Sequence, residues 1–370
     1  MRVLVATGLY PPEIGGPATY AALLEALLPK EGVTVDVAPF REVRKYPKAI
    51  RHLVYAWTVF RRCKDVDLVV ALDPFSVGVP ARIAAFVRSK KFVVKVVGDY
   101  AWEQARQRFG YSGTIEEFQK AEVDLIPTFM RWCERVVART ASHVIVPSKY
   151  LGVIIGGWGV PNEKMSVIYN GVSIADVGEK ETIRGVLHFS GKLIISVGRL
   201  VPWKGFDVVI KTFARLQKKD PELTLFIVGD GPDFEKLEKL ANERGVAERV
   251  IFAGAVDHEA LMRYIRAADV FVLNTSYEGF SHLILETMAV GTPVVTTMVG
   301  GNPEIIDDGV TGYLVSPNDT DALGKRVTKL LTDKAVYTRM VQEASKKIST
   351  YTDTRVATET ATLFKKLCAS

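Results

Sequence analysis

Short apolar runs alternate with longer amphipathic runs along most of the chain, and this alternation constrains the fold more than any other feature. Runs such as RVLVAT (2–7), LIISVG (193–198) and DVFVLN (269–274) are apolar on both faces of an extended strand. The intervening runs, such as FDVVIKTFARLQKK and DFEKLEKLANERG, have the period of amphipathic helices. Strands that are apolar on both faces and alternate with helices indicate parallel sheets covered by helices on both sides.

The alternation predicts two domains. Roughly five or six strand–helix units lie on each side of Asn170-Gly171, a turn dipeptide suited to a hinge, and 370 residues fit two domains of ordinary size. We therefore expect an α/β chain of two doubly wound, Rossmann-like domains, one over 1–170 and one from 171 onward, whose parallel sheets face each other across a cleft. Ligands should bind in that cleft, at the carboxyl ends of the strands. The expected strands are 2–7, 33–39, 67–72, 92–98, 143–148, 165–170, 193–198, 223–229, 249–254, 269–274 and 292–297.

Composition narrows the class of protein. Apolar residues make up 48% and charged residues 24% of the chain, the balance of a globular protein rather than a disordered one. No window holds the eighteen or so consecutive apolar residues of a membrane-spanning helix, and the opening MRVLVATGLY resembles a buried strand more than a signal peptide. Three widely spaced cysteines indicate reduced thiols and a cytoplasmic protein.

Charge is distributed unevenly. Residues 1–170 hold 23 basic and 16 acidic side chains, whereas residues 171–370 hold 25 and 26. The basic half contains the stretch 40–64, which we interpret either as a patch for anionic lipid head groups or acidic glycans, or as an ordinary solvated helix face. Nucleic acid is a poorer fit because no known binding motif accompanies the charge. The basic residues of this stretch are Arg41, Arg44, Lys45, Lys48, Arg51, Arg61, Arg62 and Lys64.

Glycines follow the first expected strand. Gly15 and Gly16, in GLYPPEIGGPATY, allow close backbone approach and precede a helix, which is a natural place for an anion. A purely structural Gly-Gly turn explains them equally well. The sequence has neither a GxGxxG dinucleotide fingerprint nor a GxxxxGK[ST] loop, so NAD-binding and P-loop functions lose their main support.

Two cations follow the first strand of the second domain. In SVGRLVPWKGFD, Arg199 and Lys204 flank a loop that leads into a helix. Cations beside a helix N-terminus suit a diphosphate, although surface-loop cations are the simpler alternative.

Two glutamates lie eight positions apart in YEGFSHLILE (277–286). Glu278 follows the expected strand 269–274, and a helix is expected from about residue 281 to 288. Eight residues at helical rise span roughly 12 Å, about the separation of the two sugars of a nucleotide-sugar, and carboxylates accept hydrogen bonds from vicinal hydroxyls. A solvated helix face, or a capping residue plus a surface charge, are the alternatives.

The order and spacing of these segments closely resemble the retaining glycosyltransferases of family four, which have the GT-B fold. The resemblance covers essentially the whole chain. Its strongest elements are the E-x7-E pair Glu278 and Glu286, the segment GRLVPWKG, and GVTGYLVSPND at 309–319. Weaker elements are Gly15-Gly16, IVPSKY, VIYNGVS and VGDGP.

The resemblance implies roles for particular residues. Arg199 and Lys204 would hold the donor diphosphate, Glu286 the ribose, and Glu278 the transferred sugar. Domain 1–170 would bind the acceptor, domain 171–353 the donor, and a C-terminal helix at 354–370 would return to the first domain. The expected catalytic residues are Arg199, Lys204, Glu278 and Asp99, and the expected donor-binding residues are Gly15, Gly16, Arg199, Lys204, Gly254, Val256, Glu278, Gly279, Phe280, Ser281, His282, Leu283 and Glu286.

The chain also departs from the family pattern. Many relatives carry His-Asp at the end of the fourth strand, where this chain has Gly98-Asp99, so Asp99 becomes the candidate for contacts near the anomeric carbon. Ser173 replaces the usual aspartate after Asn-Gly-Val. The triplet Asp65-Val66-Asp67 precedes a strand, so we interpret it as surface charge rather than a metal site.

The resemblance implies a metal-independent hexosyl transfer, without a cofactor, from a UDP-, GDP- or ADP-sugar to a glycan, lipid-linked or small-molecule acceptor. Retention is expected through a same-face substitution assisted by the leaving phosphate, with double displacement through a carboxylate as the alternative. A GT-B epimerase and a non-catalytic nucleotide-sugar-binding subunit are the competing functions. We expect a cytoplasmic protein that is peripheral at the inner face of the membrane through residues 40–64.

Overall fold

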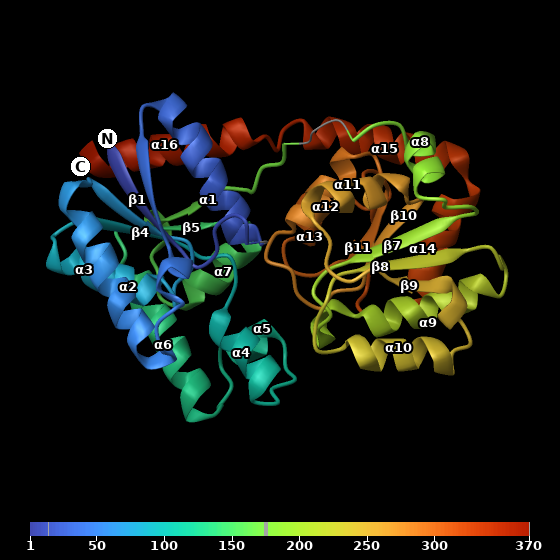
Figure 1. The fold of residues 1–370 in the computed structure, drawn as a ribbon, viewed down its shortest axis with the longest axis horizontal. Helices are drawn as coiled ribbons and strands as arrows, with labels where there is room; N and C mark the ends of the chain where they lie inside the picture. Colours follow the sequence, from blue (N-terminus) through green and yellow to red (C-terminus); the bar gives the residue numbers. More distant parts are fainter. Residues whose placement is uncertain (14, 174–176, 370) are drawn as a thin grey trace. The chain divides into compact units, whose positions relative to one another are not determined.

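The computed structural model describes residues 1–13, 15–173 and 177–369 and divides the chain into two compact units (Figure 1). Unit 1 comprises Met1–Gly171 together with Asp353–Ser370, of which Ser370 lies outside the described residues, and unit 2 comprises Val172–Thr352. The chain crosses from unit 1 to unit 2 one residue after the expected boundary at 170/171 and returns one residue before the expected boundary at 353/354. No described helix is long and apolar enough to span a bilayer.

Unit 1 is built on a parallel sheet with the strand order β2-β1-β3-β4-β5-β6. The buried strand β3 is apolar on both faces, as is β5 from Val144 to Val146, which suits a sheet between two helical layers. The chain leaves β1 toward β2 on one side and later returns to β3 on the other, so the order reverses between β1 and β3. The strands are Arg2–Thr7 (β1), Thr34–Pro39 (β2), Leu68–Ala71 (β3), Lys91–Lys95 (β4), His143–Val146 (β5) and Met165–Val167 (β6).

Helices cover both faces of this sheet (Figure 1). Helix α2 packs beside α3 and α3 beside α6, while α1 packs against α16. Helix α4 and the short helix α5 follow β4 in the chain, and α4 packs against α6. The helices of unit 1 are Gly16–Leu27 (α1), Lys48–Arg62 (α2), Gly78–Val87 (α3), Tyr100–Arg108 (α4), Ile115–Phe118 (α5), Leu125–Thr140 (α6), Lys149–Gly157 (α7) and Asp353–Ala369 (α16).

Helix α16 belongs to the core of unit 1 although it is the last element of the chain. Val356, Ala361 and Phe364 are buried in the same apolar cluster as the first strands of the sheet. The Tyr20 hydroxyl of α1 lies 3.4 Å from the Thr360 hydroxyl, and burial raises the pKa of Tyr20 to about 12. The last helix therefore completes the apolar cover over this face of the sheet.

Unit 2 contains a second parallel sheet, with the order β12-β11-β10-β7-β8-β9. The order reverses between β7 and β10, because the chain runs from β7 outward to β9 and then returns to β10. Strand β12, at one edge of this sheet, is not among the strands expected from the sequence. The strands are Leu193–Val197 (β7), Thr224–Val228 (β8), Val250–Phe252 (β9), Val270–Leu273 (β10), Val294–Thr297 (β11) and Tyr313–Val315 (β12).

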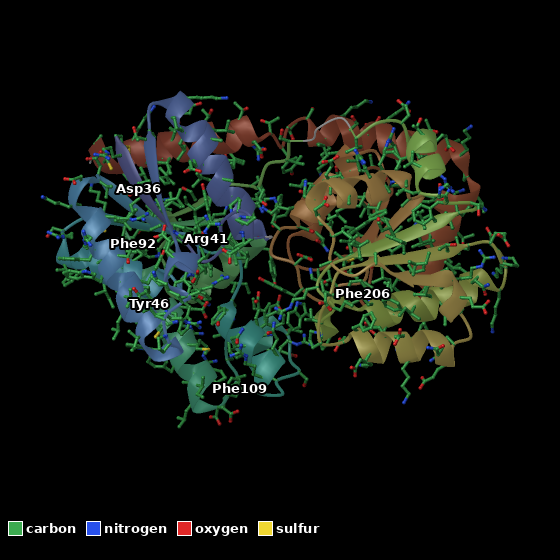
Figure 2. The ribbon with its side chains drawn as sticks, in the orientation of Figure 1. Asp36, Arg41, Tyr46, Phe92, Phe109 and Phe206 are labelled. Carbon is green, nitrogen blue, oxygen red and sulfur yellow. The ribbon has the colours of Figure 1, made fainter. Side chains whose placement is uncertain are left out.

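Two helical layers cover the second sheet. One contains α9, which packs against α10 and α14, and the other contains α11, which packs against α8 and α12. Phe206, labelled in Figure 2 at the start of α9, is buried in the core of unit 2 with Phe213 and Leu225. The helices are Lys180–Val186 (α8), Phe206–Gln217 (α9), Phe234–Glu243 (α10), His258–Ala267 (α11), His282–Ala289 (α12), Asn302–Ile305 (α13), Thr320–Thr332 (α14) and Lys334–Ile348 (α15).

The loop after β11 packs against the loop after β10. The Gly301 N–H donates a hydrogen bond of 2.9 Å to the Glu278 carbonyl. At Gly300, where φ is +57°, an added Cβ would lie 1.9 Å from that same carbonyl oxygen. Only glycine therefore fits, and the backbone of Glu278 is fixed from one side by this contact.

We expect Gly300→Ala to destabilise unit 2 more than Gly309→Ala does. Both glycines have a positive φ, +57° and +76°, but an added Cβ at Gly309 meets nothing within 4 Å. The shared backbone strain should cost about 1–2 kcal/mol in each variant. The clash with the Glu278 carbonyl should add about 1–3 kcal/mol in Gly300→Ala alone. Hydrogen-exchange mass spectrometry of unit 2 peptides in urea measures both losses, and equal losses would show that the contact does not hold the loop.

Candidate functional site

The carboxyl ends of β7 and β10 form the topological switch point of unit 2. These strands are neighbours, but the chain leaves them toward opposite edges of the sheet. The loops that follow therefore diverge, and doubly wound sheets bind ligands in the crevice that results. The loop after β7 carries Arg199 and Lys204, and the loop after β10 carries Glu278.

The structure brings Lys204 and Glu278 into direct contact. The Lys204 ammonium donates to Glu278 Oε1, and the two side chains are only 20% and 13% exposed. The backbone beneath them is also tied together, because the Trp203 carbonyl accepts hydrogen bonds from the Ser276 N–H (2.7 Å) and the Thr275 hydroxyl (3.1 Å). A cation and a carboxylate are thus held side by side at the switch point.

Close backbone packing holds the loop after β7 against the end of β10. Lys204 ends a 3₁₀ turn, Pro202–Lys204, and Gly205 follows with a φ of +63°. An added Cβ at Gly205 would lie 2.0 Å from the Asn274 carbonyl oxygen. The loop that carries the lysine can therefore approach the end of β10 only because glycine follows the lysine.

The second glutamate of the pair contacts a histidine. His258 Nε2 lies 2.9 Å from Glu286 Oε1. His258 begins α11, while Glu286 lies in the second turn of α12. The hydrogen bond to Glu286 raises the pKa of His258 above its ordinary value of 6.5, although burial acts in the opposite direction. The five histidines show no ligand spacing in the sequence, and a separation of 28 positions carries no signal of this contact.

The residues between the two glutamates form the start of α12. Ser281 caps the helix, and its hydroxyl accepts a hydrogen bond of 3.4 Å from the Ile284 N–H. Phe280 is buried with its ring 6.0 Å from the Tyr351 ring, so its side chain serves packing. Gly279 precedes this turn, and His282 and Leu283 are half-buried within it. The first N–H groups of a helix have no acceptor within the helix and favour negative charge.

The other donor-site candidates in unit 2 are less constrained. Arg199 is exposed, and among the described residues no hydrogen bond or ion pair holds its guanidinium. Gly254 and Val256 follow β9. The Gly254 carbonyl accepts a hydrogen bond of 2.8 Å from the Gly229 N–H, which joins the ends of β8 and β9.

The candidates in unit 1 occupy the ends of β1 and β4. Gly15 precedes α1, Gly16 begins it, and the Gly15 carbonyl accepts from the N–H groups of Ala18 (2.9 Å) and Thr19 (3.1 Å). Asp99 is buried and caps α4. Its carboxylate accepts hydrogen bonds of 2.8 Å from the Trp102 N–H and from the Gln119 amide.

The environment of Asp99 is that of a structural carboxyl group. Burial raises its pKa, and both of its oxygens already have donors. A contact of Asp99 with the anomeric carbon therefore stays a prediction. Gly98, beside it, lines a cavity whose carboxyl groups belong to Asp73 and Glu103, two residues that the sequence analysis did not consider as site residues.

The Asp65-Val66-Asp67 triplet lies before β3, which begins at Leu68. One carboxylate oxygen of Asp67 accepts a hydrogen bond of 2.8 Å from the Arg2 N–H. Within residues 1–13, 15–173 and 177–369, no three His, Cys, Asp or Glu side chains form a group that could hold a metal ion.

We expect Glu286→Gln to lower the pKa of His258. In the native chain the carboxylate stabilises the imidazolium, so His258 keeps its proton to a higher pH than a free histidine. The amide removes that charge, and the pKa should return toward 6.5. An NMR titration of the His258 ring measures the change, with His143 of unit 1 as an internal control whose pKa should not move. An unchanged His258 pKa would contradict the contact.

Two family models match the chain, one on each half. Residues 14–176 match the model described as Glycosyltransferase Family 4, and residues 179–347 match the model described as Glycosyl transferases group 1. Together they account for nearly the whole sequence.

Curated relatives are also glycosyltransferases by name. The chain is 33% identical over 217 residues to an uncharacterised glycosyltransferase of Methanocaldococcus jannaschii, a match that covers 56% of this chain and 55% of the relative. It is 38% identical over 148 residues to the GDP-mannose-dependent alpha-(1-6)-phosphatidylinositol monomannoside mannosyltransferase of Mycolicibacterium smegmatis, covering 38% of this chain and 39% of that protein. The chain thus spans about half, or less, of the length of these relatives.

Solved structures share the fold over the full length. Sucrose-phosphate synthase from Thermosynechococcus elongatus superposes with a TM-score of 0.82 at 19% identity, covering 100% of this chain and 99% of that one. The HepE protein of Anabaena, in complex with UDP-glucose, superposes with a TM-score of 0.77 at 20% identity and covers 99% of both chains. At this identity the likeness shows the GT-B fold alone. With a family 4 domain in its first half and a group 1 domain in its second, the chain belongs to the glycosyltransferases.

Proposed function

We propose that the chain is a retaining glycosyltransferase that moves a hexosyl unit from a nucleotide diphosphate sugar to a glycan, lipid-linked or small-molecule acceptor. The observation that carries this proposal is the contact between Lys204 and Glu278 at the switch point of unit 2. An ammonium suits a phosphate, and a carboxylate suits sugar hydroxyls. Their juxtaposition fits a ligand that presents both groups within a short distance.

In the proposed site, Lys204 and Arg199 bind the diphosphate, and Glu278 binds the transferred sugar. The backbone N–H groups from Gly279 to Leu283, in the turn before α12 and at its start, add positive potential beside the phosphates. Glu286, next to His258, binds the ribose, and the backbone from Gly254 to Val256 contacts the base. Unit 2 is thus the donor domain and unit 1, with Gly15 and Gly16, the acceptor domain.

The proposed chemistry needs stabilisation of a leaving diphosphate. Negative charge grows on that group as the glycosidic bond breaks, and Lys204 and Arg199 stabilise the charge without a metal ion. We infer retention through substitution on the same face, with the leaving phosphate assisting the acceptor hydroxyl. The Anabaena protein was solved with UDP-glucose, and the Mycolicibacterium relative is named for GDP-mannose, so both bases belong in the test.

Two substitutions separate the halves of the donor. Glu286→Gln should weaken a nucleoside diphosphate and the complete donor alike, because Glu286 binds the ribose that both contain. Glu278→Gln should weaken only the complete donor, and should leave the nucleoside diphosphate bound at least as tightly, because Lys204 then loses its internal counter-ion. A hydrogen bond to a charged acceptor contributes roughly 1.5–3 kcal/mol, a tenfold to hundredfold change in affinity.

The measurement is calorimetry with UDP, GDP, ADP and the corresponding sugar donors UDP-glucose, GDP-mannose and ADP-glucose, together with analysis of products formed from the donor that binds best. Melting temperatures control for folding. The Gly309→Ala variant, whose change lies in a loop outside the proposed site, serves as the matched control. If both glutamate variants weaken nucleoside diphosphate binding equally, the assignment of one glutamate to each sugar is wrong. If no nucleotide binds the native chain, the proposed function is wrong.

We also propose that unit 1 docks on a membrane surface, and that the basic stretch 40–64 contributes to this. Much of its charge is used within the chain: Arg44 pairs with Glu13, Arg62 with Glu42 and Asp36, and Arg41 donates to backbone carbonyls. Arg41 and Tyr46 are labelled in Figure 2. Arg61 and Lys64 are exposed, whereas the side chain of Lys48 lies outside the described residues.

Exposed apolar side chains on the same helical layer favour docking more strongly than charge does. They gather on α2, α3 and α6, which pack side by side (Figure 1). Trp and Phe prefer the interface between water and lipid, and a large exposed apolar surface marks an interaction site. The free thiols at all three cysteines suit the reducing cytoplasm, so we place the membrane contact on that side. The exposed residues are Ile50, Leu53, Trp57, Ile83, Phe86, Val87, Leu125, Ile126, Phe129 and Trp132.

We expect a Leu53→Ser/Phe86→Ser double variant to bind lipid vesicles about tenfold or more weakly than the native chain, since burial of one large apolar side chain contributes about 1.5–3 kcal/mol. Both side chains are 71% exposed, and Val186 of unit 2, which is 70% exposed, provides the control Val186→Ser. Flotation with anionic and zwitterionic vesicles at two salt concentrations measures the effect. If the native chain binds neither vesicle type, the surface of α2, α3 and α6 is an ordinary solvated face and the docking proposal is wrong.

A further inference from the structure

Unit 1 contains a cavity of about 560 Å³ at the carboxyl ends of its own strands. Its walls come from the loops after β1, β2, β3 and β4 and from the starts of α1, α2 and α4. It therefore lies at the reversal of strand order between β1 and β3, where doubly wound sheets bind ligands. The residues that matter below are Gly8, Phe40, Arg51, Asp73, Phe75 and Tyr100.

Asp73, which follows β3, presents one fixed and one open carboxylate oxygen. Its Oδ1 accepts hydrogen bonds from the N–H groups of Phe75 (2.9 Å) and Val77 (3.3 Å). Its Oδ2 lies beside Gly8, 3.4 Å from where a Cβ would be, and neither of these two hydrogen bonds reaches it. Burial raises the pKa of this carboxyl to about 6. The open oxygen of an enclosed carboxylate calls for a donor such as a ligand hydroxyl.

Arg51, on α2, is the cation of this cavity that lacks a counter-ion. Its Nε is buried without a hydrogen-bond partner, and no ion pair of Arg51 is found among the described side chains. Arg44, the other arginine in the wall, already pairs with Glu13 and donates to the Gly8 carbonyl. Burial lowers the pKa of the neighbouring His52, with Arg51 contributing in the same direction, so that imidazole is neutral at neutral pH. The Arg51 guanidinium lies over the Phe40 ring, 5.7 Å from its centroid, which leaves its charge without a counter-ion. A guanidinium with such a buried N–H calls for an acceptor that carries negative charge.

An aromatic pair supplies an apolar wall. The rings of Phe75 and Tyr100 are stacked, with centroids 5.2 Å apart and an interplanar angle of 17°. A binding site for small molecules combines such apolar surface with a few placed polar groups. Here those groups are Asp73 Oδ2, which can accept a hydrogen bond from a hydroxyl, and the Arg51 guanidinium, which can bind an anion.

We propose that this cavity binds a sugar that carries an anionic substituent, with Asp73 Oδ2 accepting from a ring hydroxyl and Arg51 binding the anion. This rests on the proposed function, in which unit 1 is the acceptor domain, and it names the chemistry of the acceptor. The anion is either a phosphate, as in a lipid-linked sugar phosphate, or the carboxylate of an acidic sugar. Both have the geometry that a guanidinium recognises.

The test is NMR on the full chain with four probes: saturation transfer for glucose 1-phosphate, glucuronate and methyl α-glucopyranoside, and ³¹P line broadening for inorganic phosphate, which has no carbon-bound proton. The two anionic sugars should bind about tenfold or more tightly than the neutral glucoside. The stronger of the two identifies the source of the anion. Equal binding of all three sugars, or binding of none, would overturn the proposal.

Three variants assign the contacts. Arg51→Gln should reduce the binding of the anionic sugars to that of the neutral glucoside, while Asp73→Asn should weaken every sugar and leave inorganic phosphate unaffected. Arg61→Gln is the matched control, because it removes an exposed arginine from the same helix outside the cavity wall, and it should change nothing. If Arg61→Gln has the same effect as Arg51→Gln, the anion is attracted by general charge and the proposed subsite is wrong. Because Arg51 is partly exposed and its side chain makes no hydrogen bond, we expect Arg51→Gln to fold. This variant therefore tests the anion contact even if Asp73→Asn does not fold.

Nucleoside diphosphate binding on the same samples separates this inference from the proposed function. Nucleotide binding without any sugar binding would leave the donor site standing and overturn the anionic-sugar subsite. Sugar binding without nucleotide binding would support the subsite and overturn the glycosyltransferase function.

Discussion

Each strand of the two sheets pairs in parallel with its neighbours, and the location of every candidate site depends on this constraint. Parallel neighbours end at the same edge of a sheet, so the loops after them gather there however distant they are in sequence. Lys204 and Glu278 are 74 positions apart but meet because β7 and β10 are adjacent. The same constraint in unit 1 places Gly8, after β1, next to the Asp73 carboxylate, after β3.

The ion pair at the switch point also bears on which ligands the proposed donor site accepts. A cation and a carboxylate in contact satisfy each other, so a ligand must replace both interactions to bind without loss. A free phosphate offers a partner to Lys204 but repels Glu278, while a neutral sugar offers hydroxyls to Glu278 but nothing to Lys204. A nucleotide-sugar offers both partners at once. The ion pair between Lys204 and Glu278 thus disfavours the separate halves of the donor in the proposed site.

Much of the fold was predictable from the sequence, and the exceptions have physical causes. Short, almost wholly apolar runs between turn residues, such as 193–197 and 270–273, favour strands buried on both faces, and these became β7 and β10. Strand β12 was missed because its apolar run, Tyr313–Val315, is bounded directly by Gly312 and by Ser316-Pro317. The equally short β6 and β9 lie within longer, mostly apolar runs and could be expected. The E-x7-E pair and the lysine loop could be named from their motifs, whereas their individual contacts could not. The capping role of Asp99 was legible in principle, since an aspartate before a helical run is an N-cap signal.

The two glutamates differ in the partner that the fold gives each of them, and this bears on how they can act. Glu278 faces the Lys204 ammonium, so its carboxylate stays paired until a ligand displaces that ammonium. Glu286 faces His258, whose raised pKa keeps the imidazolium to a higher pH than usual, but which still loses its proton as pH rises through that pKa. Below the pKa, a ribose must share the Glu286 carboxylate with a cation, and above it the carboxylate has only a neutral neighbour. Binding at the ribose end of the proposed site should therefore depend on pH through His258, while binding at the sugar end depends on the exchange of one ion pair for ligand contacts.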